Sequence, residues 1–213
     1  MKHDYTLMSL MGLVAVAIGW ASILISITLN PWFSLCKNTL SDLGALGIPS
    51  NYVFNVGLMI ASIPAFLYGL FFIKYMSRAL SKSGGALLCL SAIFLFLTGF
   101  FPEGVEPHFA VSTAFFTLTL IAAFIVSLSV LTSSRGHGVV EVALIVIALC
   151  TSLLPWPSIG ALETAILVLV TLWLIVMLHY HLKVERARLS SSKAIGDWLR
   201  SFTAISSPLH RAT

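Results

Sequence analysis

Six long apolar runs constrain this chain more than any other feature of its sequence. They cover residues 7–29, 52–73, 86–101, 108–131, 139–154 and 161–180. Each run is close to the ~20 residues of α-helix that cross a hydrocarbon layer roughly 30 Å thick. Transmembrane strands alternate apolar and polar residues, whereas these runs are apolar on every side. The runs therefore predict an all-α, polytopic membrane bundle of six transmembrane helices.

The composition excludes a water-soluble fold. Only 9% of the 213 residues are charged and 58% are apolar, whereas roughly a quarter of an average soluble domain is charged. The first run is longer than the apolar core of a typical signal peptide, so we interpret it as an uncleaved membrane anchor. The net charge of +4 does not indicate nucleic-acid binding, because the basic residues lie where membrane topology requires them.

The distribution of lysine and arginine predicts the orientation in the membrane. Positively charged residues are enriched in cytoplasmic segments of membrane proteins. If the N-terminus is cytoplasmic, the expected cytoplasmic segments hold Lys2, Lys74, Arg78, Lys82, Arg135, Lys183, Arg186, Arg188, Lys193, Arg200 and Arg211. Lys37 is then the one basic residue of the outer loops. We therefore expect a multi-pass protein of the cell membrane with both termini in the cytoplasm.

The sequence divides into a transmembrane domain, residues 1–181, and a basic cytoplasmic tail, residues 182–213. In the tail, the serines at 190–192 are candidate caps of a separate helix. Apolar residues then recur at helical spacing: Ile195, Trp198, Leu199, Phe202 and Ile205. This pattern predicts an amphipathic helix lying in the membrane interface against anionic lipid. A solvated, partly disordered tail is the alternative.

Polar residues are concentrated in the segments that this topology places at the outer face. The ligand-binding candidates there are Ser41, Asp42, Asn55, Glu103, His108, Ser112 and Glu163. Ionisable groups close to hydrocarbon are costly and are usually paired or functional. We therefore expect Asp42 and His108 to share one polar site, with Asn55 lining it. In the structural alternative, Asp42 caps a loop helix and His108 caps the fourth transmembrane helix.

A carboxylate and an imidazole are also ligands for Zn²⁺ and other divalent ions. Asp42, His108 and one glutamate are the candidate ligands, and the same groups suit general acid–base chemistry. The sequence contains no HxxxH or HExxH motif, and this face offers a single histidine. A divalent metal is therefore one option for a cofactor that the sequence does not identify.

Several motifs of this face resemble a known family. These are Asn38-Thr39-Leu40-Ser41-Asp42-Leu43-Gly44, then N-Y-V-F-N-V-G over residues 51–57, and Phe101-Pro102 followed by His108. They resemble "domain of unknown function 998", a group of prokaryotic six-helix membrane proteins, over roughly residues 10–180. The resemblance implies the fold and the membrane, but no activity. Its motif positions are Ser41, Asp42, Gly44, Asn55, Gly57, Pro102 and His108.

Three functions remain open at this point. The favoured hypothesis is a protein whose outward-facing polar site binds a lipid head group or another small molecule. The first alternative is a metal-dependent, membrane-embedded hydrolase or transferase that uses Asp42 and His108. The second alternative is a transporter, although the sequence shows neither paired broken helices nor an internal repeat. Membrane lipid is the expected partner, nucleic acid is not, and the oligomeric state is open.

Overall fold

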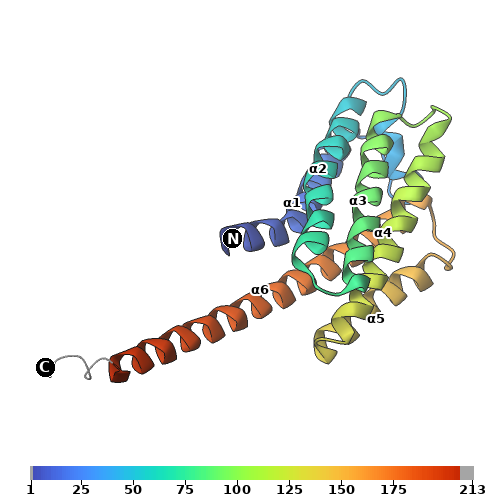
Figure 1. Cartoon of the computed structure of the whole chain (residues 1–213). Coiled ribbons are helices and arrows are strands. Elements are labelled where there is room, and N and C mark those ends of the chain that lie inside the picture. The colour runs from blue at the N-terminus through green and yellow to red at the C-terminus, as the bar shows by residue number, and fades with distance from the viewer. Residues whose placement is uncertain (1, 207–213) are drawn as a thin grey trace, which may run out of the picture. The chain divides into compact units, whose positions relative to one another are not determined.

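The computed structural model describes residues 2–206, and the regular elements of this part of the chain are helices joined by short connections (Figure 1). The elements in chain order are α1 (Lys2–Leu29), the 3₁₀ turn η1 (Leu40–Gly44), α2 (Asn51–Tyr75), α3 (Ala79–Phe100), α4 (Pro107–Leu131), α5 (Arg135–Thr151) and α6 (Ile159–Ser206). No strand occurs among the described residues. The predicted all-α class is therefore confirmed.

Five of these helices, α1, α2, α3, α4 and α6, are long and apolar enough to cross a bilayer. The chain is accordingly a membrane protein. Helix α5 has 17 residues and is about 26 Å long at 1.5 Å per residue. It is shorter than the other five, because the chain leaves the helix at Ser152 and then meets Pro155 and Pro157.

Helices α1 to α4 pack in sequence order, and α5 packs on α4. Small residues allow α2 and α3 to approach closely. A Cβ atom placed on Gly85 would lie 2.8 Å from the carbonyl oxygen of Gly69, and one on Gly69 would lie 2.7 Å from the amide nitrogen of Cys89. Close contact between backbones is a usual way for helices to associate in lipid, where no hydrophobic effect drives them together.

The first part of α6 is tied to the bundle by two tryptophans. The indole of Trp173 on α6 donates a hydrogen bond to the hydroxyl of Ser127 on α4, at 2.8 Å. The indole of Trp20 on α1 donates to Thr171 on α6, at 3.1 Å. Buried tryptophans usually find such an acceptor. Helix α6 therefore packs against both α1 and α4.

The chain forms two compact units, Met1–Met177 and Leu178–Thr213. In the second unit, α6 continues without interruption through the serines at 190–192 to Ser206. The separate helix predicted to begin at those serines is therefore wrong. Alanine, leucine, lysine and arginine surround the serines and favour helix, so three serines do not end it. The side chains of Phe202 and Ile205 lie outside the described residues.

Candidate functional site

The segment between α1 and α2 is built around a capping box. Thr39 precedes η1, and its hydroxyl accepts a hydrogen bond from the amide of Asp42 at 3.1 Å. In return, Oδ2 of Asp42 accepts from the amide of Thr39 at 3.0 Å. The same oxygen also accepts from the side-chain amide of Asn38 at 3.1 Å. Asp42 thus stabilises its own turn, as the structural alternative expected.

Two further hydrogen bonds fix the chain that follows η1. The buried side chain of Asn55 on α2 donates to the carbonyl of Gly44 at 2.9 Å. The amide of Leu46 donates to the carbonyl of Glu103 at 3.0 Å, which joins this segment to the α3–α4 connection. The ends of α1 and α3 and the starts of α2 and α4 therefore share one end of the bundle, which we call the η1 end.

His108 is buried at the start of α4. Its Nδ1 lies 2.6 Å from the carbonyl oxygen of Phe101 and, since a carbonyl only accepts, carries the proton. Its Nε2 lies 3.1 Å from a carboxylate oxygen of Glu103. His108 therefore connects the end of α3 to the start of α4 and holds Glu103 beside it. No hydrogen bond joins His108 to Asp42 in the part of the chain that the structure describes.

The start of α6 is bound to the chain preceding α2. Oε2 of Glu163 accepts a hydrogen bond from the amide of Leu40 at 2.8 Å. The amide of Gly160 donates to the carbonyl of Asn38 at 3.1 Å. The hydroxyl of Ser158 donates to the carbonyl of Leu35 at 2.5 Å and accepts from the amide of Ala161 at 3.0 Å. These bonds place Glu163 directly under η1.

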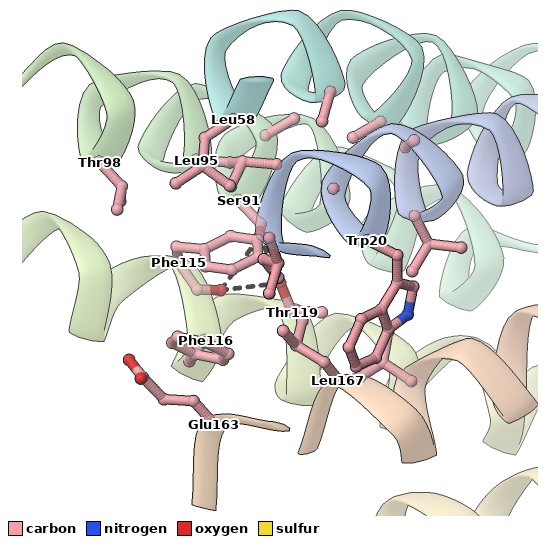
Figure 2. A pocket seen from close by; sticks show the side chains of 18 of the residues that line it. Trp20, Leu58, Ser91, Leu95, Thr98, Phe115, Phe116, Thr119, Glu163 and Leu167 are labelled. Carbon is pink, nitrogen blue, oxygen red and sulfur yellow. Dashed lines mark hydrogen bonds between the residues drawn. The ribbon is translucent and has the colours of Figure 1, made fainter. Parts of the chain in front are cut away.

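A cavity of about 150 Å³ lies inside the first unit, bordered by α1, η1, α2, α3, α4 and α6 (Figure 2). At the η1 end it is bordered by Ser41 and Glu163, and at the other end by Tyr68 and Leu174. Glu163 and Leu174 are eleven residues apart on α6, which corresponds to roughly 17 Å of helix. The cavity is therefore elongated along the helices.

The lining of the cavity is almost entirely apolar. Aromatic and aliphatic side chains such as Trp20, Leu58, Leu95, Phe115 and Leu167 surround it (Figure 2).

Most polar groups along the cavity wall are already engaged. The hydroxyls of Ser91 and Thr119 lie 2.6 Å apart and also bind the carbonyl of Phe115. Thr98 donates to the carbonyl of Phe94 in its own helix. Among the described residues, the middle of the cavity therefore offers no free polar group.

The seven predicted site residues separate into two groups. Ser41, Ser112 and Glu163 border the cavity. Asp42, Asn55, Glu103 and His108 do not; they hold the connecting segments of the η1 end together. Among the described residues, no group of three or more His, Cys, Asp or Glu side chains is arranged to hold a metal ion. The structure therefore places the candidates at one end of the bundle, but among the described residues their side chains do not form one common metal-binding cluster.

Sequence reasoning missed two features. The cavity has no linear signal, because its wall is drawn from six elements. The second feature is Glu141 on α5, which is fully buried and whose carboxylate oxygens have no hydrogen-bond partner among the described residues. A buried acid in a membrane helix is costly and often functional. Glu141 lies on the one buried face of α5, with Gly138, Ile145 and Ala148, and this spacing was visible in the sequence.

Comparison with known proteins gives one match. A family model described as "Protein of unknown function (DUF998)" matches residues 13–180. No curated protein and no solved structure matches the chain.

Proposed function

We propose that this chain, which belongs to the DUF998 family, is a six-span protein of the cell membrane that holds the apolar chain of a lipid within its helix bundle. The elongated, apolar cavity is the observation that carries this proposal. An engineered cavity of similar volume with an apolar lining stays dry and binds small apolar molecules. A narrow cavity extending over three helical turns suits a flexible hydrocarbon chain better than a bulky ring.

The polar end of the cavity supports a defined orientation for the lipid. Ser41, within η1, and Glu163, bound to the amide of Leu40, border one end of the cavity. The opposite end is bordered by Tyr68, Trp173 and Leu174. The head group belongs at Ser41 and Glu163, and the hydrocarbon chain extends toward Tyr68. The basic residues favour a cytoplasmic location for the opposite end, so the head group faces the outer leaflet.

Bromine quenching of tryptophan tests this proposal. Trp20 and Trp173 border the cavity, whereas Trp32, Trp156 and Trp198 do not. A protein in which the last three are phenylalanine reports on the cavity alone. We expect 12-bromododecan-1-ol to quench its fluorescence in detergent in a saturable manner, because the brominated end of the chain passes beside both indoles.

Gly19→Leu is the matched blocking variant. Gly19 borders the cavity, and a Cβ atom built on it meets no atom within 4 Å, so a leucine can fill the space without displacing the helix. Gly136→Leu is the control, because Gly136 has equally open surroundings but does not border the cavity. Saturable quenching should disappear in Gly19→Leu and persist in Gly136→Leu. Equal quenching in both variants would show that the bromine acts only from the detergent micelle.

A further inference from the structure

We infer that the polar end of the cavity selects single-chain amphiphiles whose head group donates a hydrogen bond, an alcohol or an alkylammonium, over those with an anionic head group. This inference rests on the proposed function and adds the chemistry of the ligand. The groups that carry it are the carboxylate of Glu163 and the hydroxyl of Ser41, both of which border the cavity.

The carboxylate of Glu163 is fixed through one oxygen and leaves the other available. Oε2 accepts from the amide of Leu40 at 2.8 Å, which holds the carboxylate at the cavity. No described residue donates a hydrogen bond to Oε1. Figure 2 shows the Glu163 side chain extending from α6 toward Phe116, on the cavity wall. Hydrogen bonds to a charged carboxylate oxygen are roughly twice as strong as those between neutral groups, so a donor on the ligand is the complementary group.

The charges around this end disfavour an anion. The Asp42 carboxylate accepts from the amide of Thr39 and the Glu163 carboxylate accepts from the amide of the next residue, Leu40, so the two acidic side chains are neighbours. Like charges brought together in an interface disfavour binding. The imidazole of His108 is directed to Phe101 and Glu103, and the side chain of Lys37 is exposed. A ligand carboxylate would therefore meet the Glu163 carboxylate without a compensating cation from these residues.

Ser41 is the second polar group of the site, and its hydroxyl can bind either a donor or an acceptor on the ligand. The residue is 9% exposed, it borders the cavity, and its hydroxyl has no hydrogen-bond partner among the described residues. A hydroxyl both donates and accepts. Ser112, by contrast, already donates to the carbonyl of Phe109 at 3.1 Å. An alcohol can therefore donate to Glu163 and accept from Ser41, whereas an alkylammonium uses Glu163 alone.

The test compares three probes that differ only in the head group: 12-bromododecan-1-ol, 12-bromododecylammonium and 12-bromododecanoate. Quenching of Trp20 and Trp173 is measured in the otherwise unmodified, full-length protein carrying phenylalanine at positions 32, 156 and 198. Quenching in the Gly19→Leu variant is subtracted to remove the contribution of the micelle. We expect the apparent Kd of the alcohol and of the ammonium to be at least about tenfold lower than that of the carboxylate.

Two glutamine variants assign the selectivity to a residue. Glu163→Gln removes the negative charge and presents an amide donor, so the difference between ammonium and carboxylate should fall below about threefold. Glu106→Gln, an exposed carboxylate in the neighbouring connection, should leave the difference unchanged. Equal binding of all three probes to the unmodified protein would overturn the inference and leave the proposed function standing. Absence of saturable quenching by every probe would overturn the proposed function itself, and an unchanged preference in Glu163→Gln would refute the role of Glu163.

Discussion

At the scale of single residues, the acidic side chains of the η1 end have different partners and therefore different roles. Asp42 uses Oδ2 to bind the amide of Thr39 and the side chain of Asn38. Glu103 lies beside His108, and Glu163 binds the amide of Leu40 at the cavity. The spacing of Thr39 and Asp42 is the sequence signature of a capping box, so the role of Asp42 was predictable. The partner of Glu163 was not, because it lies 123 residues away.

We expect Asp42→Ala to lower the free energy of unfolding by about 1–2 kcal/mol, the usual cost of losing a capping side chain. The reason is that the amide of Thr39 and the side chain of Asn38 both lose their acceptor. Glu106→Ala is the control, since its side chain is exposed and makes no capping bond. Thermal unfolding in detergent gives the measurement. Equal destabilisation by the two variants would contradict the role assigned to the capping box.

At the scale of helices, the sequence predicted apolar spans better than it predicted helix ends. The runs at 52–73 and 108–131 lie within α2 and α4. Helix α3 begins at Ala79, seven residues before the predicted apolar run. The run missed this start because the first turns of the helix are not apolar. Ser81, Gly84 and Gly85 are nevertheless buried there, and the Ser81 hydroxyl lies 2.7 Å from that of Ser129 on α4. Hydropathy alone does not detect a helix buried through small and hydroxylated residues.

The end of α6 carries exposed apolar residues beside basic ones. Ile195, Trp198 and Leu199 are 60%, 62% and 51% exposed, and Lys193 and Arg200 lie on the same part of the helix. We expect this segment to contact anionic lipid. A spin label at position 194 should therefore be less accessible to an aqueous relaxation agent in bilayers with anionic lipid, and Trp198→Glu should abolish this protection.

Trp198→Phe should retain that protection, because the aromatic side chain is kept. Truncation after Arg186 provides the structural control, because residues 187–200 are exposed except for the half-buried Gly196. It should leave the thermal unfolding of the first unit unchanged within about 2 °C. A strongly destabilised truncated protein would mean that the tail packs as core, contrary to this prediction.

At the scale of the whole molecule, composition and charge predict the number of spans and their orientation, but they do not predict the cavity. Its volume depends on how residues as small as Gly12, Ala15 and Gly19 face larger ones such as Phe54 and Phe115. No pattern within a single helix encodes that complementarity. The sequence could therefore identify Ser41, Ser112 and Glu163 as polar residues of one end, but not the apolar space that they border.

The topology predicts the side from which each end is labelled. In a protein whose native cysteines Cys36, Cys89 and Cys150 are replaced, a cysteine at Glu106 should react with an impermeant maleimide added to intact cells. A cysteine at Ser133, in the α4–α5 connection, should react only after the cells are opened, because the positively charged loops stay inside. Reaction of both in intact cells would be inconsistent with an odd number of spans between them.

The bonds that join the first connection to the start of α6 have a consequence for biosynthesis. The amide of Leu40 and the carbonyl of Leu35 each find their partner 123 residues later in the chain, at Glu163 and Ser158. A ribosome adding about 5–20 residues per second needs roughly 6–25 s to make that stretch. During this interval η1 has its own capping box but lacks the contacts from α6. The polar end of the cavity is therefore completed only after the start of α6 has been synthesised, late in the folding of the bundle.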